Sequence, residues 1–323
     1  MGMIDRARAF VGAGPQPAPW PPRRLSLALQ GGGSFGAFTS GVLDRLLERE
    51  IEFDAVSGAS AGAVNAVLMA SGLIEGPAAA RAKLARFWKR MSQSASFLPA
   101  ASLAAAAMNV GFGALTRTLS PAQFNPFDLN PLREALAAEI DFAELRARSP
   151  VKLLIAATRV RDGQLKIFRE REITVETVLA SACLPLVHRT IEIDGEPYWD
   201  GGYAANPPLI PLVQASDAPN LLVVQVTPAK SDTLPASPRE IMKRLDQIHF
   251  NATLNAELEA LKIGLVLRAT AKLRRLRIGR IAAQDEFDGL EGESAADLGW
   301  AFLERLRESG RSATDAWIAQ TAG

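Results

Sequence analysis

The sequence contains very little cysteine and histidine. Its 323 residues include one cysteine, Cys183, and two histidines, His188 and His249. A Cys/His zinc site needs more ligands than these and a disulfide needs a second cysteine, so both are excluded. Any chemistry must therefore come from hydroxyl groups, carboxylates and the backbone. Cys183 itself lies in the apolar stretch 179–187, which favours a buried structural cysteine.

An excess of charge of one sign is also absent. Lys and Arg number 36 against 35 Asp and Glu, which leaves a formal net charge of +1 at pH 7. Proteins whose main partner is nucleic acid usually carry a clear basic excess, so nucleic acid is not expected as a partner. Apolar residues make up 48% of the chain and charged residues 22%, a balance typical of a protein that buries a sizeable core. Disorder over the whole length is therefore excluded.

Long uninterrupted apolar runs are missing as well. The first residues contain a Pro-rich run, Pro15 to Pro22, but no apolar core long enough for a signal peptide, so we expect a flexible tail over residues 1–24 and a cytoplasmic protein. The longest uncharged stretch, Met91 to Thr116, is interrupted by Pro99 and Asn109 and is not expected to span a bilayer. Two interpretations of this stretch stay open: a buried Ala-rich helix, or a mobile apolar cap beside a site for apolar substrates.

The chain does contain a regular alternation of strand and helix patterns. A predicted strand at Leu25–Gln30 precedes a helix at Gly36–Arg49, and a second strand at Phe53–Ser57 precedes a helix at Ala63–Ser71. This order predicts an α/β fold with a parallel sheet flanked by helices. Further strands are predicted at Val151–Thr158, Gln164–Glu170, Leu221–Thr227 and Leu276–Ala282, a hairpin at 190–199 around Asp194-Gly195, and helices at Ala78–Met91, Pro131–Ala138, Thr174–Ala182, Pro238–Ala271 and Ala295–Ala319.

A first motif, Gly58-x-Ser60-x-Gly62, lies between the second predicted strand and its helix. Glycines on both sides leave room for a strained turn that lifts the Ser60 hydroxyl clear of the backbone, and the N-terminus of the following helix lies beneath it. This context favours a nucleophilic serine. The alternative is that the small residues only pack a tight turn between strand and helix.

A second motif, the run GGGSFG from Gly31 to Gly36, lies between the first predicted strand and its helix. Consecutive glycines at a helix N-terminus expose N–H groups that can bind an anion, either a tetrahedral oxyanion or a phosphate. The run also fits the Gly-x-Gly-x-x-Gly fingerprint of dinucleotide-binding proteins. That fingerprint needs an acidic residue at the end of the second strand, whereas Asp54 lies at its beginning. A Walker-type phosphate loop is excluded because Gly-Lys-Ser/Thr does not occur.

A third motif, Asp200-Gly201-Gly202, follows the predicted hairpin. A carboxylate at a strand end, followed by two residues without side chains, can approach another loop closely and accept a proton. The alternative is an ordinary turn. The order Ser60, Asp200, His249 also allows a catalytic triad, with His188 as a second candidate for the imidazole. The position of Ser60 argues against a triad, because several strands precede the nucleophile in α/β-hydrolases and only two precede it here.

Taken together, the three motifs resemble the patatin-like phospholipase family in their order and spacing. The resemblance covers roughly Leu25 to Thr227. It implies a three-layer α/β/α sandwich with a mostly parallel central sheet, a catalytic domain over residues 25–227, and a mainly helical C-terminal extension over residues 228–323 that packs on the same core. Outside the three motifs, the resemblance extends to Ala180–Pro185, Ile193–Gly195, Tyr198-Trp199 and Asn206–Pro208.

The resemblance also implies a Ser-Asp dyad that uses no histidine and no cofactor. Carried over by position, Ser60 is the nucleophile and Asp200 is its base. The expected activity is that of a serine acyl hydrolase of phospholipase A, lipase or esterase type, which cleaves lipid or related esters through an acyl-serine intermediate. Two alternatives stay open: a catalytically weak lipid-binding or interaction module on the same fold, and a dinucleotide-dependent oxidoreductase. The backbone of Gly31, Gly32, Gly33 and Ser34 is expected to form the oxyanion hole, and Gly36, Gly58, Gly62, Gly201 and Gly202 to support the motifs.

Two features bear on substrates and partners. The family often has a basic residue where Phe35 stands, so a neutral ester becomes more credible as the substrate than one recognised by its phosphate. The region Arg239 to Arg280 holds ten Lys or Arg against four Asp or Glu and includes the run Lys272 to Arg277. It is interpreted as a peripheral contact with anionic lipid head groups, as a contact with a partner protein or a second copy, or as a solvated face.

Overall fold

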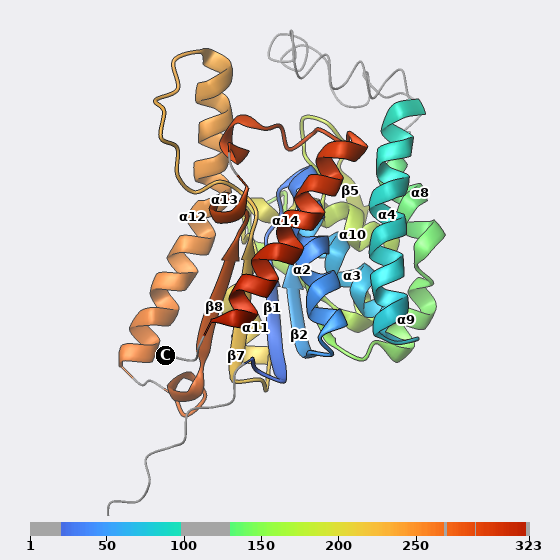
Figure 1. Cartoon of the computed structure of the whole chain (residues 1–323). Helices are drawn as coiled ribbons and strands as arrows, with labels where there is room; N and C mark the ends of the chain where they lie inside the picture. The colour runs from blue at the N-terminus through green and yellow to red at the C-terminus, as the bar shows by residue number, and fades with distance from the viewer. Residues whose placement is uncertain (1–20, 98–129, 268–269, 288, 321–323) are drawn as a thin grey trace, which may run out of the picture.

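An eight-stranded sheet lies at the centre of the computed structural model, which describes residues 21–97, 130–267, 270–287 and 289–320 (Figure 1). Across the sheet the order is β5 (Ile191–Ile193), β6 (Glu196–Asp200), β3 (Lys152–Arg159), β2 (Glu52–Gly58), β1 (Arg24–Leu29), β7 (Asn220–Gln225) and β8 (Arg277–Ala282), and β4 (Leu165–Arg169) also pairs with β3. The strands β3, β2, β1, β7 and β8, which are adjacent in this order, pair in parallel. The pairs β3–β4, β3–β6 and β5–β6 are antiparallel. The predicted α/β fold with a mostly parallel sheet is confirmed.

The strands divide their side chains between two separate apolar cores. Successive side chains of a strand point to opposite faces of a sheet. Accordingly, Leu27 and Leu29 of β1 belong to one core and Ala28 to the other, and Val56 and Ala55 of β2 are divided in the same way. A sheet buried on both faces needs a layer of helices on each, which gives the three-layer α/β/α arrangement.

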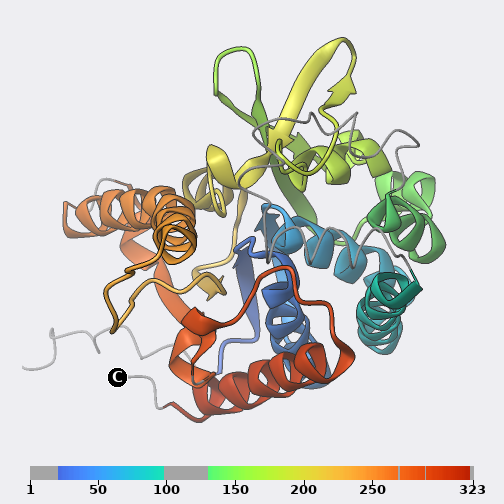
Figure 2. The same ribbon diagram turned by 90° about the horizontal axis from the view of Figure 1, so that it is seen from above.

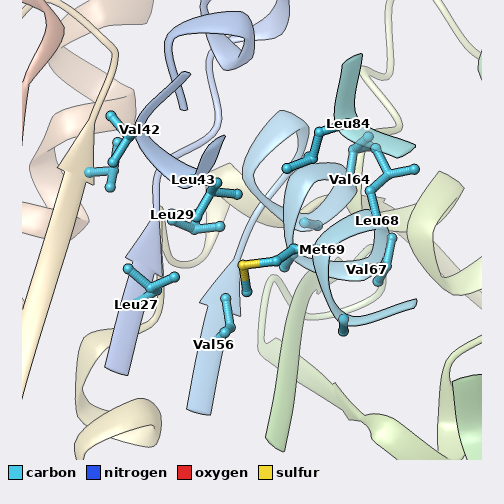
Figure 3. Packing of buried hydrophobic residues seen from close by; sticks show 14 of the residues in the cluster. Leu27, Leu29, Val42, Leu43, Val56, Val64, Val67, Leu68, Met69 and Leu84 are labelled. Carbon is cyan, nitrogen blue, oxygen red and sulfur yellow. The ribbon is translucent and has the colours of Figure 1, made fainter. Parts of the chain in front are cut away.

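The larger core lies between the sheet and the helices α2 (Gly36–Glu48), α3 (Ala61–Leu73) and α4 (Pro77–Phe97). Every residue of α3 from Ala61 to Gly72 is buried, as expected for a helix that is apolar on all sides. Figure 3 shows Met69 of this helix beside Val56 of β2, and Val64 beside Leu84 of α4. The helix that follows Ser60 is therefore held rigidly in the interior.

The smaller core lies on the opposite face of the sheet. It is formed by α11 (Leu209–Ala215) and α12 (Pro238–Val266), which contribute Leu212 and Leu254 among others. Seen from above, α12 lies on the other side of the central strands from α2 and from α14 (Trp300–Ala319) (Figure 2). The long helix α12 is thus the outer layer on this face.

The C-terminal helix α14 packs closely on α2. A Cβ atom at Gly41 of α2 would lie 1.9 Å from the carbonyl oxygen of Arg307, and one at Gly310 would lie 2.1 Å from a carbonyl oxygen of α2, so both contacts require glycine. The nearly buried carboxylate of Asp44 on α2 then accepts hydrogen bonds from Arg307 and Arg311 of α14. The predicted helical C-terminal region is present, and β8 adds a strand from it to the sheet. The domain boundary at residue 227 stays a prediction.

The predicted hairpin and two of the predicted short helices are present in the structure. The hairpin around Asp194-Gly195 is confirmed, because β5 and β6 pair antiparallel and the two turn residues have φ of 52° and 77°, as a type I′ turn requires. The predicted helix at Pro131 is α8 (Pro131–Glu139), which begins after Asn130. The Asn130 side chain accepts a hydrogen bond from the N–H of Arg133 and so caps the helix. The predicted helix at Thr174 is α10 (Val175–Ser181).

Two helices of seven residues each were not predicted. The first, α9 (Phe142–Arg148), is capped locally by Asp141, which accepts from two backbone N–H groups of its first turn. The second, α11, is capped by Glu257 of α12, whose Oε2 accepts from the N–H groups of Leu209 and Ile210 at 2.7 and 2.6 Å. A cap supplied by a distant helix leaves no local sequence signal, which explains why α11 was missed.

The helix predicted from Ala295 is wrong in its start, since α14 begins only at Trp300. The carbonyl oxygen of Ala295 instead accepts the N–H of Ser34 at 2.8 Å. A turn follows, in which the N–H of Gly299 donates to the Asp297 side chain. A contact with the glycine loop therefore replaces the first helical turn.

Two predictions fall mainly outside the described residues. Residues 1–20 of the predicted tail and residues 98–116 of the Met91 to Thr116 stretch are not described, and α4 ends at Phe97. Among the helices of the described ranges, none combines the length and the apolar character that a bilayer-spanning segment needs.

Candidate active site

The three glycine-containing motifs meet at one edge of the sheet. Leu29, the last residue of β1, pairs with Gly58 at the end of β2, and Gly58 pairs with Ile155 of β3. Asp200 at the end of β6 pairs with Ala157, two residues further along β3. The carboxyl ends of parallel strands share one edge, which is where α/β proteins commonly bind ligands. The sheet register therefore places Ser60 and Asp200 on the same side of the molecule.

Ser60 occupies a strained turn between β2 and α3. Its φ of 53° and ψ of −125° are rare for a residue with a side chain. Both flanking glycines are sterically required, because a Cβ at Gly58 would lie 2.5 Å from the carbonyl carbon of Gly62, and a Cβ at Gly62 would lie 2.0 Å from the carbonyl oxygen of Leu29. The Ser60 N–H is held by Ser181, whose carbonyl and hydroxyl oxygens each lie 3.1 Å away. The turn presents a half-buried serine at the N-terminus of α3.

Asp200 is fully buried, and its environment changes its acidity. Burial raises the pKa of the Asp200 carboxyl from its ordinary value of 3.8 to about 7, while hydrogen bonds from the N–H of Gly202 and the hydroxyl of Ser60 act in the opposite direction. The Gly202 N–H donates to Oδ1 at 2.7 Å. Oδ2 has no donor of ordinary hydrogen-bond geometry among the described residues, so the contact with Ser60 is the looser of the two. A buried carboxylate oxygen beside the serine is left open as a proton acceptor.

The glycine loop packs directly on the turn that carries Ser60. A Cβ atom at Gly31 would lie 2.7 Å from the Cβ of Ser60, and one at Gly36 would lie 2.8 Å from the Cβ of Ala61. Gly33 between them has φ of 58°, in the left-handed region that favours glycine. Each of these three glycines therefore meets a steric or conformational requirement at the site.

The N–H groups of the loop are not equally available to a ligand. The N–H of Gly31 donates to Oδ1 of Asn206 at 2.7 Å, and that of Ser34 donates to the carbonyl oxygen of Ala295 at 2.8 Å. The N–H groups of Gly32 and Gly33 have no acceptor in the part of the chain that the structure describes, and both residues are at least partly exposed. The predicted oxyanion hole stays a prediction, and its available donors are narrowed from four residues to these two.

Asn206 and Thr227 hold the loop in place, and the sequence did not assign either a role. Asn206 is fully buried, and its Nδ2 donates to the carbonyl oxygens of Gly31 at 3.4 Å and of Phe250 at 3.2 Å. The Thr227 hydroxyl donates to the carbonyl oxygen of Gly31 at 3.0 Å. In the sequence, Asn206 belongs to the segment Asn206–Pro208 that resembles the family. This resemblance was the only sequence feature that could have indicated a role for Asn206.

The residues around Asp200 fix its backbone. A Cβ atom at Gly201 would lie 2.2 Å from a carbonyl oxygen of β3, and one at Gly202 would lie 2.3 Å from the ring of Phe250. The N–H of Asp200 donates to the carbonyl oxygen of Cys183 at 2.9 Å. Cys183 is buried, as predicted, and supports the site through its backbone.

Neither histidine is among the groups that shift the pKa of Asp200. His249 lies exposed on α12, with its ring centroid 5.5 Å from that of Tyr203. Burial, followed by the charges of Asp200 and other groups, raises the pKa of Tyr203 to about 12, which places the phenol close to the carboxylate. A tyrosine that stays protonated at neutral pH therefore contacts the His249 ring and interacts with the charge of Asp200.

The side chain of Phe35 and the basic run Lys272 to Arg277 both lie outside the candidate site. Phe35 is buried, and its ring packs edge-on against Phe302 of α14 with the centroids 6.3 Å apart. The position at which a basic residue was considered is therefore turned into the larger core. The run Lys272 to Arg277 leads into β8, where Arg277 pairs with Asn220 at the start of β7, on the amino-terminal edge of the sheet.

Asp54, the acidic residue considered for the dinucleotide-binding fingerprint, interacts with residues away from the glycine loop. It lies in the first half of β2 and forms an ion pair with Arg24. It also accepts hydrogen bonds from the Ser216 hydroxyl at 3.0 Å and the Asp217 N–H at 2.6 Å. Its role is to tie the strands together at the edge opposite the glycine loop. Within the described ranges, no three His, Cys, Asp or Glu side chains are grouped so that they could hold a metal ion.

Comparison with known proteins gives one family match. The family model described as Patatin-like phospholipase matches residues 27–213, more than half of the chain, including all three motifs. Among curated proteins, the chain is similar to the Uncharacterized protein YjjU of Escherichia coli (strain K12), with 26% identity over 225 residues, 66% of this chain and 54% of that protein. The chain therefore spans about half the length of the curated relative that it matches.

Among solved structures the similarities are remote. VipD from Legionella pneumophila is 16% identical, with a TM-score of 0.39, and the match covers 90% of this chain and 68% of that one. ExoU, in its heterodimeric complex with SpcU from the type III secretion system of Pseudomonas aeruginosa, is 15% identical, with a TM-score of 0.40 and coverage of 93% and 52%.

Proposed function

The chain belongs to the patatin-like phospholipase family, and from this premise we propose that it is a serine acyl hydrolase that cleaves lipid ester bonds through an acyl-Ser60 intermediate. One observation carries the proposal: a serine in a strained turn lies beside a buried carboxylate and a loop with free N–H donors. Each of these groups has a separate part in acyl transfer. Together they supply a nucleophile, a base and a donor cluster for negative charge.

In the acylation step, Asp200 accepts the proton of the Ser60 hydroxyl as Oγ attacks the ester carbonyl carbon. The carbonyl oxygen becomes negatively charged, and the N–H groups of Gly32 and Gly33 donate hydrogen bonds to it. The tetrahedral intermediate then collapses and the bond from the carbonyl carbon to the alcohol oxygen breaks. The alcohol takes the proton from Asp200 and leaves, and the acyl group remains bound to Ser60.

In the deacylation step, water takes the place of the alcohol. Asp200 accepts a proton from the water as its oxygen attacks the acyl-Ser60 carbonyl. The same donors hold the second oxyanion, the bond to Ser60 Oγ breaks, and the proton returns to Ser60. The products are a carboxylic acid and the free enzyme, so one carboxylate serves both half-reactions.

The burial of Asp200 makes a dyad without histidine chemically reasonable. A carboxylate with an ordinary pKa is a poor base, because it holds a proton weakly at neutral pH. Burial raises the pKa of Asp200 to about 7, close to the value of about 6.5 typical of histidine. The carboxylate therefore supplies the basicity that a triad takes from imidazole.

Two assays on the full chain test the proposal. A fluorophosphonate probe labels an activated serine, and hydrolysis of carboxylic esters, phosphatidylcholine among them, shows turnover. We expect both labelling and release of free acid. A lipid-binding or interaction module on the same fold would bind lipid but would neither react with the probe nor release acid.

The activity is expected to rise with pH and to level off above about pH 7. Asp200 must be ionised to accept the Ser60 proton, and its pKa is raised to about 7, so the ionised fraction falls about tenfold for each pH unit below that value. The measurement is kcat/KM for a soluble ester across the neutral and acidic range. A rate that stays constant down to about pH 5, in protein shown to remain folded, would contradict the role of Asp200.

Replacing Asn206 by alanine is expected to lower kcat about a hundredfold with little change in KM. The change leaves the Gly31 N–H without its acceptor and frees the loop that carries the N–H groups of Gly32 and Gly33. Steady-state kinetics on the folded variant measure the effect. Asn220→Ala, at the opposite edge of the sheet, is the matched control and should behave as wild type. Equal kinetics for the two variants would contradict a positioning role for Asn206.

A further inference from the structure

The N-terminal half of α12 exposes a row of large apolar side chains. Ile241, Met242, Leu245 and Ile248 are 43%, 55%, 52% and 51% exposed, and we call these four residues the α12 apolar face. Their spacing places Ile241, Leu245 and Ile248 on one side of the helix, with Met242 at its margin. The opposite side of the same helix packs on the sheet through Leu254 and Leu261. The helix is therefore apolar towards solvent as well as towards the core.

The α12 apolar face lies at the same end of the sheet as the candidate active site. Figure 1 shows that the N-terminal half of α12 projects beyond the strand ends at which the site motifs lie. Directly after Ile248 in the chain, His249 lies against Tyr203, and Phe250 packs on Gly202, the residue that donates to Asp200. A surface that covers this face would therefore lie towards the end of the sheet that carries the reacting groups.

The charges around the face are nearly balanced. Arg239, Lys243 and Arg244 lie on these turns of the helix together with Glu240 and Asp246. Lys243 donates to the carbonyl oxygen of Glu293 at 2.6 Å and Arg244 to that of Ala229 at 3.0 Å, so these two cations are turned towards the protein. A partner of this face is therefore recognised by its apolar character, with a small contribution from charge.

We propose that the α12 apolar face docks the protein on a lipid bilayer and so brings the Ser60 edge of the sheet to the lipid. The inference rests on the proposed function, because esters of long acyl chains are held in bilayers and must be reached there. An amphipathic helix binds such an interface by burying its apolar side at the boundary between head groups and acyl chains. The basic run Lys272 to Arg277 lies at the opposite edge of the sheet, so it cannot face the same bilayer surface.

The test is vesicle binding by the full chain carrying Ser60→Ala, so that the lipid is not degraded. In this background we compare the parent with Met242→Gln, Leu245→Gln, Ile248→Gln, combined, because glutamine keeps the helix propensity. On phosphatidylcholine vesicles we expect the combined variant to bind at least about tenfold more weakly. Added salt should change the binding of the parent by less than about twofold, since few charges take part.

Two matched variants serve as controls in the same background. Ile263→Gln with Leu267→Gln changes two apolar residues that are 59% and 72% exposed, one in the last turn of α12 and one directly after it, and binding should not change. Lys272→Gln with Arg274→Gln and Arg275→Gln neutralises the basic run, and binding should again be unchanged. With Ser60 restored, the apolar-face variant should hydrolyse vesicle phospholipid more slowly but a soluble short-chain ester at the wild-type rate within about twofold.

Three outcomes would overturn the inference. The first is that the apolar-face variant binds vesicles as tightly as the parent does. The second is that the control variants lose as much binding as the apolar-face variant. The third is that light scattering shows a dimer for the parent and a monomer for the apolar-face variant, which would mean that a second copy covers the face. Failure of the proposed function is distinguishable from all three, because wild-type protein would then release no acid from either ester, whatever the vesicle binding shows.

Discussion

Replacing Ser60 by alanine is expected to reduce ester turnover by roughly 10⁴-fold or more and to abolish labelling by a fluorophosphonate. Without the hydroxyl oxygen no acyl intermediate forms, whereas the strained turn, the glycine contacts and α3 remain in place. The Ser60 side chain is only half buried, so its loss removes little packing, and the thermal unfolding temperature should hardly change. Steady-state hydrolysis and thermal unfolding of the same preparation measure both effects.

Ser57→Ala is the matched control for this substitution. Ser57 lies three residues earlier on β2, and its buried hydroxyl has no hydrogen-bond partner among the described residues. Its loss should leave both kcat and probe labelling unchanged. If the Ser60→Ala protein hydrolyses esters at the wild-type rate, Ser60 is not the nucleophile.

Replacing Asp200 by asparagine is expected to remove activity nearly as completely as the loss of Ser60. An amide keeps the shape of the carboxyl group and can still accept the hydrogen bond from the Gly202 N–H, but it cannot accept the proton of the serine hydroxyl. The measurement is kcat for a soluble ester at about pH 8, where the carboxylate of the wild type is ionised.

The same substitution should stabilise the fold above neutral pH. The carboxyl ionises at its ordinary pKa in the unfolded chain and only at about 7 in the folded protein, so ionisation of Asp200 costs stability as the pH rises between these values. Asp200→Asn removes this cost, on the order of 4 kcal/mol at about pH 8, and gains little at about pH 4. Denaturant unfolding of both proteins at the two pH values measures the difference.

His188→Gln combined with His249→Gln separates a dyad from a triad. If Asp200 is the base, the folded double variant keeps substantial turnover, because neither imidazole carries a proton. A triad predicts the reverse, with the imidazole indispensable and the carboxylate only orienting it. Loss of several orders of magnitude in kcat for the double variant would mean that one of the histidines is the base.

Much of the fold follows from local patterns in the sequence. Leu27, Ala28 and Leu29 alternate between two cores, and this buried strand was visible as an apolar run bounded by polar and glycine residues. The Asp194-Gly195 pair specifies its own hairpin turn. These features depend on neighbours within a few residues, so a single sequence is enough to predict them.

The details of the candidate site could not be predicted from the sequence, because they depend on contacts between residues that are far apart in the chain. Asn206 and Thr227 form hydrogen bonds with Gly31, from which they are 175 and 196 residues apart in the chain. The Ala295 carbonyl oxygen accepts a hydrogen bond from the N–H of Ser34. Only the folded chain shows which N–H groups of the glycine loop remain free. The burial that raises the pKa of Asp200 likewise comes from surrounding layers of structure, since nothing in the motif itself distinguishes this aspartate from one in an exposed turn.

The most direct test of the central claim is to locate the fluorophosphonate adduct by mass spectrometry after digestion of the labelled full chain. We predict a single adduct on the peptide that contains Ser60, formed in the wild type and in the double histidine variant and lost in Asp200→Asn. An adduct on another residue, no adduct on folded wild-type protein, or labelling that Asp200→Asn leaves unchanged would contradict the proposal that Asp200 activates Ser60.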